Sequence, residues 1–306
     1  ATAGSGAGRG MSGAGGVGGV GQHVRLSGPV GGPGDAAGVH AEAWFSLPGR
    51  HNRMNLLQAA AAACEALRLA DRPAPVIERL LRSAIPELRP PRGRLELVGS
   101  GAPGDEPALV FVDFAHTDDG LRKALEALRP LVAPDASLWA VFGAGGNKDA
   151  TKRPRMGRAA AELADRVVVT SDNPRREPPH EIVSQIIAGI PEPDRDRVIV
   201  QVDRSRAIRA AVLGAAEAYA ARRAASDDPA TVSRDVVLIA GKGHETEQIV
   251  CGAGGHLVSR RFVDQEEAAA ALAEARAAVE GEPGRSGRPT PPPVVVVAGE
   301  AAEERA

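Results

Sequence analysis

The stretch 138–175 constrains the fold more than any other, because a strand pattern, a helix pattern and a second strand pattern follow one another in it. The apolar run 138–142 ends in glycines, which let the backbone turn sharply. Pro154 suits the first turn of a helix, where its missing N–H has no partner to lose. The apolar run 167–169 is typical of a fully buried strand and leads into a polar turn. This turn is therefore expected at the carboxyl end of a parallel strand, where ligands bind in open α/β sheets.

The same alternation of strands and helices continues on both sides of this stretch. Asp203 is placed to cap the helix that follows it, and the glycines at 252–256 are typical of a hairpin turn. The alternation predicts an α/β fold with a doubly wound sheet. We expect its other strands at 94–98, 108–113, 198–202 and 235–240, and its other helices at 120–128, 181–190, 205–223 and 264–279.

The first part of the chain has a different character. Residues 1–35 are glycine-rich without apolar periodicity, so they are predicted to be a flexible segment. Their glycines do not lead into Gly-Lys-Ser/Thr, so they do not form a phosphate-binding P-loop. Asn52 is expected to be the N-cap of an alanine-rich helix. The further expected elements are a strand at 41–47, helices at 54–69 and 75–83, a linker at 85–91 and a disordered tail at 281–306.

Composition excludes several classes of function. The chain has 37 lysine and arginine residues against 39 aspartate and glutamate residues, a formal net charge of −2, which does not indicate a nucleic-acid partner. Cys64 and Cys251 lack metal or redox spacing. No apolar run is long enough to cross a membrane and no signal peptide is evident, so a cytoplasmic protein without a membrane partner is expected. Lysine is scarce, and a compositional bias of the genome explains the scarcity itself, whereas a lysine kept against that bias suggests a task. The lysines are Lys123, Lys148, Lys152 and Lys242.

Polar clusters follow several of the predicted strands. In a parallel sheet these clusters share one edge and can build a single site. Turn chemistry alone is the competing explanation, because aspartate and asparagine are common in turns. The clusters are Asp113 with His116 and Thr117, the run 147–149, the run 172–175 and the run 241–245.

The content of these clusters suits a zwitterionic ligand. Arg175 can hold a carboxylate through two parallel hydrogen bonds, and Lys148 offers a second positive charge. Asp172 and Glu245 can bind an ammonium group. Gly241 lets the backbone approach a ligand closely. A surface ion-pair network of little energetic weight is the structural alternative.

Six segments together resemble the Mur ligases, and within them the subfamily that adds the third residue of the peptidoglycan stem peptide. Each segment alone is modestly specific, but the ordered set with its spacing is highly specific. The resemblance covers residues 41–272. The segments are LPGRHNRMN at 47–55, DFAHT at 113–117, FGAGG at 142–146, KRPRMG at 152–157, DNPR at 172–175 and GKGHE at 241–245.

The resemblance implies an ATP-dependent amide ligase of peptidoglycan synthesis. In this family ATP and Mg²⁺ activate a carboxylate of UDP-N-acetylmuramoyl-L-alanyl-D-glutamate (the UDP-MurNAc-dipeptide), and the amine of meso-diaminopimelate then attacks it. The implied architecture is a Rossmann-like C-terminal domain preceded by the end of the central ATP-binding domain. The implied boundaries are 1–35 for the flexible segment, 36–89 for the central-domain remnant, 90–280 for the C-terminal domain and 281–306 for the tail.

The resemblance also assigns roles to individual positions. Those that resemble diaminopimelate-binding positions are Lys148, Asp172, Asn173, Arg175, Gly241 and Glu245. Those that resemble nucleotide-side positions are Asn52, Asn55, Asp113, His116 and Thr117.

Two departures from the family limit what the chain is expected to do. Lys148 stands where an arginine is usual, so the charge is kept but the bidentate fork is lost. No P-loop occurs and no lysine precedes Lys123, so no catalytic residue and no metal ligand is assigned to this chain. Ligation is expected only with the missing N-terminal half. A non-catalytic diaminopimelate-binding module and an inactive remnant remain open, whereas a folate polyglutamylating ligase would not need the 172–175 motif.

Overall fold

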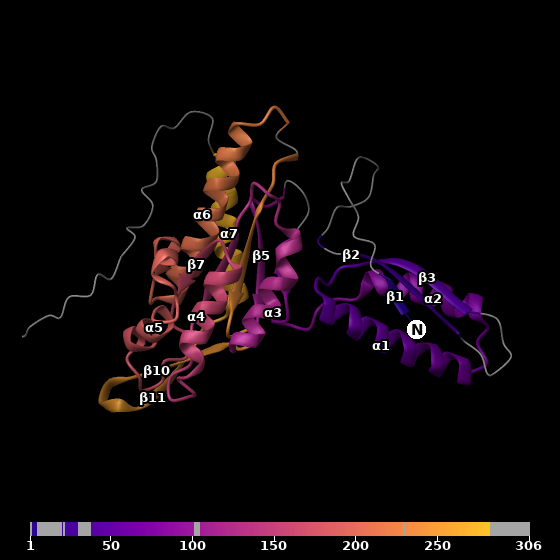
Figure 1. Cartoon of the computed structure of the whole chain (residues 1–306), viewed down its shortest axis with the longest axis horizontal. Coiled ribbons are helices and arrows are strands. Elements are labelled where there is room, and N and C mark those ends of the chain that lie inside the picture. Colours follow the sequence, from indigo (N-terminus) through magenta and orange to yellow (C-terminus); the bar gives the residue numbers. More distant parts are fainter. Residues whose placement is uncertain are drawn as a thin grey trace, which may run out of the picture.

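The computed structural model describes residues 2–4, 20, 22–29, 38–100, 105–228 and 231–281. These residues form two units (Figure 1). The N-terminal unit has one hydrophobic core, and the C-terminal unit has two, one on each face of its sheet. The predicted disorder of the tail concerns residues that lie outside the described part, beyond residue 281. Within the described ranges, no helix is both long enough and apolar enough to span a bilayer.

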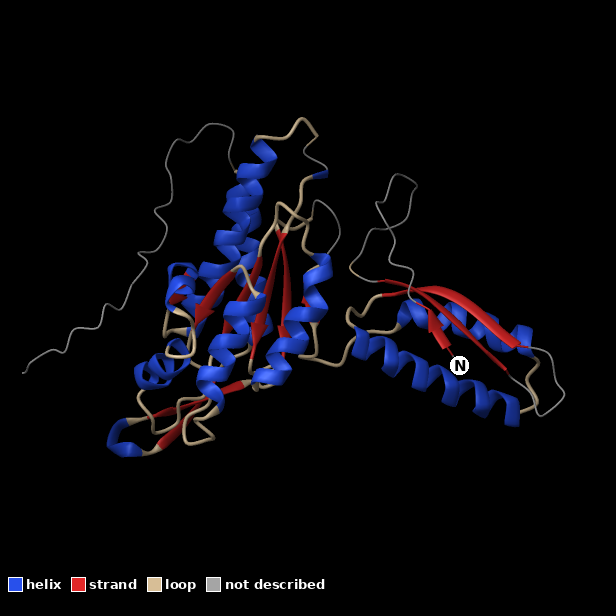
Figure 2. Ribbon diagram, viewed as in Figure 1, coloured by secondary structure: helices blue, strands red, loops and turns tan. Residues whose placement is uncertain are grey.

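The N-terminal unit packs two helices against a small antiparallel sheet, whose strand order is β1-β2-β3 (Figure 2). Its core is formed where β2 and β3 meet the helices, around Phe45, Leu56 and Ile77. The elements of this unit are β1 Thr2–Gly4, β2 Gln22–Pro29, β3 Gly38–Phe45, α1 Arg50–Leu69, α2 Ala74–Ala84 and the 3₁₀ turn η1 Ile85–Glu87.

Strand β2 shows that the prediction of a flexible segment over 1–35 is wrong for residues 22–29. Val24 and Leu26 are buried while His23 and Arg25 are exposed, which is the alternation of a half-buried strand. The strand pairs with β3 along its whole length, from Gln22 opposite Phe45 onward. The glycine-rich sequence on both sides of this short apolar alternation masks its strand signal. Strand β1, which pairs with β2, is a second departure from that prediction.

Asn52 is not the N-cap of α1. The helix begins at Arg50, and Gly49 occupies the cap position with a φ of 94°, a conformation that favours glycine. Asn52 lies in the first turn, where its Nδ2 donates to the carbonyl oxygen of Pro48 at 2.7 Å. Its side chain therefore stabilises the start of the helix from inside the helix.

The C-terminal unit is built on a six-stranded sheet with the order β4-β5-β9-β6-β7-β8. Strand β4 is antiparallel to β5, and the other neighbours are parallel, so the predicted doubly wound α/β fold is confirmed. The strands are β4 Glu96–Val98, β5 Ala108–Asp113, β6 Leu138–Phe142, β7 Arg166–Val169, β8 Val198–Val200 and β9 Asp235–Ala240.

Helices cover both faces of this sheet, because alternate side chains of the strands point to opposite faces. One core lies under α3, α4 and α5, and the other lies under α6 and α7. Asp203 caps α6 as predicted, since its carboxylate accepts the N–H of Arg206 at 3.0 Å. The helices are α3 Asp118–Leu128, α4 Lys152–Leu163, α5 Pro179–Ile187, α6 Arg204–Ala224 and α7 Asp264–Glu280, with 3₁₀ turns η2 Arg129–Leu131 and η3 Glu192–Arg197.

A hairpin follows β9 and lies beside the carboxyl end of the sheet (Figure 1). It pairs β10 Glu247–Cys251 with β11 Leu257–Arg261 around the 3₁₀ turn η5 Ala253–Gly255. The predicted hairpin turn at 252–256 is therefore confirmed. As shown below, β10 holds one of the polar turns of the site in place.

Candidate functional site

The carboxyl ends of four parallel strands lie at one level of the sheet. Asp113 at the end of β5 and Phe142 at the end of β6 are both in register with Ala240 at the end of β9. Phe142 is also in register with Val169 at the end of β7. The predicted polar clusters therefore do emerge along one edge, which is where open α/β sheets bind ligands.

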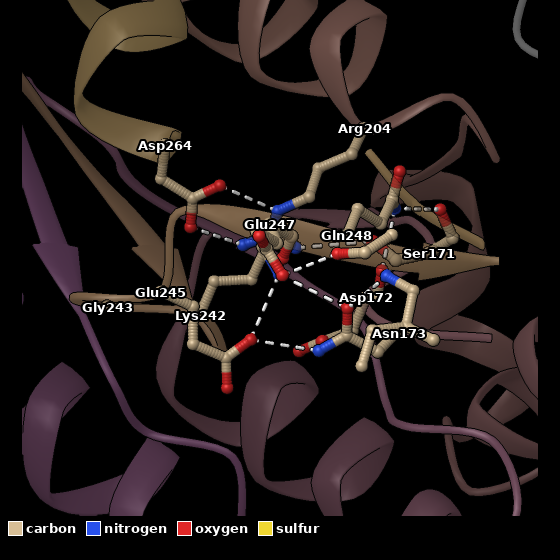
Figure 3. Close-up of polar contacts among 12 residues, drawn as sticks. Ser171, Asp172, Asn173, Arg204, Lys242, Gly243, Glu245, Glu247, Gln248 and Asp264 are labelled. Carbon is tan, nitrogen blue, oxygen red and sulfur yellow. Dashed lines mark hydrogen bonds and ion pairs between the residues drawn. The ribbon is translucent and has the colours of Figure 1, made fainter. Parts of the chain in front are cut away.

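Two of these clusters, the turn 170–173 after β7 and the loop 241–245 after β9, are in direct contact (Figure 3). Gly241 has a φ of 121°, and a Cβ there would lie 2.5 Å from Oδ2 of Asp172. Only a glycine lets the β9 loop come this close to the carboxylate. The two clusters thus form one compact polar site.

The Asn173 amide links the two clusters. Its Nδ2 donates to Oε2 of Glu245 at 2.9 Å, and its Oδ1 accepts the N–H of Ile249 at 2.9 Å. Oδ1 also accepts from Nζ of Lys242 at 3.3 Å. The carbonyl oxygen of Asn173 faces the other way and accepts the N–H of Gly146 at 2.9 Å. Asn173 is therefore fixed by contacts from three directions.

Glu245 is the half-exposed acid of the site. Its Oε2 accepts from Asn173 and, at 3.0 Å, from Nζ of Lys242. Burial on its own raises the pKa of Glu245, but the hydrogen bonds from Asn173 and Lys242 outweigh burial and lower it overall. Glu245 is therefore a carboxylate at neutral pH, and it can attract a cation.

Asp172 is a buried carboxylate that receives no hydrogen bond from the described part of the chain; its side chain is 6% exposed. Burial raises the pKa of Asp172, and the positive charges of Arg204 and Lys242 only partly offset this. A buried carboxylate without a hydrogen-bond donor is unfavourable unless a cation approaches it. The site therefore offers a place for a ligand ammonium group.

The hairpin strand β10 holds the 171–175 turn from outside. Nε2 of Gln248 donates to the carbonyl oxygen of Asp172 at 2.6 Å, and Arg260 of β11 donates to Oε1 of Gln248. The N–H of Arg175 donates to the carbonyl oxygen of Ile249 at 3.1 Å. These hydrogen bonds hold the turn against the hairpin.

The side chains of Arg175 and Lys148 both lie close to Gly145. A Cβ at Gly145 would lie 3.0 Å from Nη1 of Arg175 and 3.7 Å from Cγ of Lys148. Nη1 of Arg175 donates to the carbonyl oxygen of Gly146 at 2.9 Å, and in the described part of the chain no hydrogen bond engages Nη2 or Nε. Arg175 adopts a φ of 54°, which is strained for a residue with a side chain. The guanidinium and the exposed Lys148 ammonium together offer donors for an anionic group.

The glycine loop that carries Lys148 is braced by Arg153, which is 1% exposed. Nη1 of Arg153 donates to Glu177 and Gln185, and Nη2 donates to the carbonyl oxygen of Gly145 at 3.0 Å. The buried guanidinium of Arg153 therefore holds the glycine loop in its conformation.

The predicted nucleotide-side residues are mostly engaged in local structure. Both carboxylate oxygens of Asp113 accept backbone N–H groups, from Leu95 at 2.8 Å and from Ala115 at 2.7 Å. Burial raises the pKa of Asp113, against the lowering effect of these hydrogen bonds. Oγ1 of Thr117 caps α3 by accepting the N–H of Gly120 at 3.1 Å. Nδ1 of the exposed His116 lies 2.9 Å from the carbonyl oxygen of Phe114.

A groove of about 590 Å³ lies between the start of α1 and the end of α3. Arg50, His51, Arg53 and Lys123 give it a mostly basic lining, with Glu126 as the acidic member. None of the five predicted nucleotide-side residues lines this groove, since Asn52 is buried in α1 and Asn55 is exposed farther along it.

Metal ligands are not gathered anywhere in the described part of the chain, where no group of three or more histidine, cysteine, aspartate or glutamate residues is placed to hold an ion. The residues described do not fit an Mg²⁺ site by themselves. The site at the sheet edge is instead a set of paired cations and carboxylates.

The fold and this site define the class of protein. The model of the Mur ligase glutamate ligase domain matches residues 93–243. This part of the chain is a Mur ligase C-terminal domain. Within the family it is similar to proteins named UDP-N-acetylmuramoyl-L-alanyl-D-glutamate–2,6-diaminopimelate ligase.

Two of these relatives and one solved structure define the extent of the similarity. The ligase of Neisseria meningitidis serogroup B is 42% identical over 227 residues, 74% of this chain and 38% of the relative. The ligase of Prochlorococcus marinus is 44% identical over 234 residues, 76% of this chain and 40% of the relative. A solved structure of a ligase with the same name is 31% identical with a TM-score of 0.54, covering 83% of this chain and 43% of that one. The chain spans about two fifths of the length of these relatives.

Of the four residues that hold the site together from inside, three were not predicted, and the scarcity of lysine pointed only to Lys242. Lys242, Gln248, Arg204 and Asp264 are all buried and all contact the polar turns or each other. For Lys242 a signal existed in the scarcity of lysine. For the other three the sequence offered none, because their partners are far away along the chain.

Proposed function

We propose that this chain is the C-terminal portion of an ATP-dependent amide ligase that adds meso-diaminopimelate to UDP-N-acetylmuramoyl-L-alanyl-D-glutamate in cytoplasmic peptidoglycan synthesis. The task of this portion is to hold the incoming amino acid. Its own residues bind and orient the ligand, and they transfer no phosphoryl group.

One observation carries the proposal: the site places the guanidinium of Arg175 beside the backbone carbonyl of Asn173 and the carboxylate of Glu245 beside its side-chain amide. Nη1 of Arg175 lies 3.5 Å from the carbonyl oxygen of Asn173, and the Asn173 side-chain amide contacts Glu245. The far end of diaminopimelate carries one carboxylate and one ammonium on the same carbon. Arg175 with Lys148 suits the carboxylate, and Glu245 with Asp172 suits the ammonium. Lysine lacks that carboxylate, so this arrangement favours diaminopimelate.

ATP and Mg²⁺ belong to the proposed reaction as a whole, in which they supply activation of the substrate carboxylate. The described residues include no metal-binding cluster, and Asp113 and Thr117 are used for backbone hydrogen bonds. We therefore place the metal ligands and the phosphoryl-transfer machinery in the N-terminal half of the ligase. The isolated chain is proposed to bind the amino acid without ligating it.

The test is calorimetric titration of the whole chain with meso-diaminopimelate and with L-lysine. We expect diaminopimelate to bind at least about tenfold more tightly, because a charge-assisted bidentate contact contributes 1.4 kcal/mol or more. Arg175→Lys should remove most of this preference. Arg176→Lys is the matched control, since Arg176 is the exposed next residue, and it should leave the preference unchanged. Equal affinity of the wild-type chain for both amino acids would contradict the proposal.

A binding-only role is the second candidate, because the described residues include a polar site but no metal-binding cluster. The discriminating experiment mixes the chain with the N-terminal half of a related ligase, ATP, Mg²⁺ and both substrates. Amide formation in the mixture supports a ligase portion. Diaminopimelate binding without amide formation supports a non-catalytic module, and absence of both supports an inactive remnant.

A further inference from the structure

Lys242 is a completely buried cation at the centre of the site, with 0% exposure of its side chain. Its ammonium group has three hydrogen atoms and three acceptors in the structure. These are Oε2 of Glu245 at 3.0 Å, Oδ1 of Asn173 at 3.3 Å and the carbonyl oxygen of Glu247 (Figure 3). Because it is buried, Lys242 does not meet a ligand itself.

The contacts of Lys242 decide how its two neighbours face the ligand. Oδ1 of Asn173 accepts from Lys242 and from the Ile249 N–H, so the amide is turned with Nδ2 toward Glu245. Oε2 of Glu245 accepts from both Lys242 and Asn173. In the described part of the chain Oε1 of Glu245 accepts no hydrogen bond, so this oxygen is left for a ligand cation.

Stability alone does not explain a buried lysine here. Taking an ammonium group out of water is expensive, and well-packed apolar side chains are often equally stable in place of a buried ion pair. Lysine is also rare in this chain, with four lysines among the 37 lysine and arginine residues. A compact point donor serves three acceptors around it, whereas the planar guanidinium of arginine presents its donors in one plane.

We propose that Lys242 is a positioning residue that presets Asn173 and Glu245 to receive the distal ammonium group of the amino acid. The inference rests on the proposed function, because it names the part of the ligand that Glu245 meets. Lys242 acts through Glu245 and Asn173 and leaves the carboxylate end of the ligand to Arg175.

The test compares two ligands with the wild-type chain and with Lys242→Met. One ligand is meso-diaminopimelate, and the other is 2-aminopimelate, which keeps the distal carboxylate but lacks the distal amine. Lys242→Met should weaken diaminopimelate binding about tenfold, as coupled neighbours in one network do. It should change the affinity for 2-aminopimelate by less than about twofold, because that ligand has no distal ammonium group for Glu245 to bind.

The matched control is Arg222→Met in α6, whose ion-pair partner Asp235 lies at the opposite end of β9 from Lys242. Arg222 pairs at 2.6 Å with Asp235, which is 1% exposed, so this variant likewise removes the cation of an ion pair that has one buried member. It should lower stability without changing either affinity. Equal weakening of both ligands by Lys242→Met would overturn the positioning role while leaving the proposed function intact. A wild-type chain that does not bind diaminopimelate would instead refute the proposed function.

Two measurements keep the inference testable if Lys242→Met does not fold. Lys242→Arg keeps the charge but not the tetrahedral donors, so it should show the same selective loss for diaminopimelate. In the wild-type chain, the ¹⁵N signal of the Lys242 ammonium should be protected from solvent exchange by its three acceptors. Wild-type affinity in Lys242→Arg, or a freely exchanging ammonium, would overturn the inference.

Discussion

Arg204 and Asp264 form an ion pair in which both side chains are fully buried, with Nη2 and Oδ2 2.7 Å apart. Nη1 of Arg204 also donates to the carbonyl oxygen of Ser171 at 3.3 Å, and Nη2 donates to that of Ala240 at 3.0 Å. One guanidinium thus joins the first residues of α6 and α7 to the ends of β7 and β9. These hydrogen bonds hold Ser171 and Ala240, from which the two polar turns of the site begin.

Removing one member of this pair should be strongly destabilising. Arg204→Met leaves Asp264 buried without its partner, so the free energy of unfolding should fall by about 3–5 kcal/mol. Urea denaturation measures the change. The double variant Arg204→Met/Asp264→Leu should recover much of the loss, because the Asp264 carboxylate is then removed together with its partner. Arg261→Met breaks an exposed pair with Glu266 and serves as the control. A loss for Arg204→Met no larger than for Arg261→Met would contradict the prediction.

Asp172→Asn should stabilise the folded chain at neutral pH. Because burial raises the pKa of Asp172, the folded protein holds this proton more tightly than the unfolded chain does. Stability is therefore lost as the pH rises from the ordinary value of 3.8 through the folded-state pKa. The amide does not titrate, so the variant should gain about 0.5–2 kcal/mol above this window and nothing below it. Denaturation at a series of pH values measures the difference.

Asp165→Asn is the control, because it should change stability at neutral pH in the opposite direction. Burial raises the pKa of Asp165, but hydrogen bonds from Arg129 and Leu138 outweigh it, and the net shift is downward. Its ionised form is stabilising, so Asp165→Asn should lower stability at neutral pH. Diaminopimelate binding should weaken in Asp172→Asn and stay unchanged in Asp165→Asn. A less stable Asp172→Asn at neutral pH would show that the carboxylate is stabilised by contacts other than those described.

The strands and the polar edge of the sheet were predictable because their signals are local. β5, β6 and β9 have the predicted bounds, since each is a continuous apolar run between turn residues. The contacts within the site were not predictable. Lys242 meets Asn173 across 69 positions of sequence, and Arg204 meets Asp264 across 60. Such pairs depend on how the helices pack on the sheet, which no local pattern encodes. The Asn52 prediction was wrong for a local reason: α1 begins at Arg50, two residues earlier, so the amide contacts the carbonyl of Pro48 and not the N–H groups that an N-cap would bind.

Thr117 provides a direct comparison of a structural role with a ligand-binding role. If its hydroxyl serves as the cap of α3, Thr117→Ala should reduce the free energy of unfolding by about 1 kcal/mol, and Thr117→Ser should restore most of it. Asp203→Ala, at the cap of α6, should show a loss of similar size. Chemical denaturation measures all three. An unchanged stability in Thr117→Ala would mean that the hydroxyl is free for a nucleotide-side role.

Lys148→Arg should tighten diaminopimelate binding, because an arginine restores two parallel donors to a carboxylate where lysine offers a point charge. Lys148 is exposed, and its side chain and that of Arg175 both lie close to Gly145. Its ammonium group can therefore reach the anion that Arg175 is proposed to hold. We expect affinity to rise by about threefold to tenfold in calorimetric titration. Lys148→Met should weaken binding. Lys123→Arg, at an exposed lysine that pairs with Asp119 on α3, should leave affinity unchanged. Unchanged or weaker binding in Lys148→Arg would mean that Arg175 alone holds the distal carboxylate.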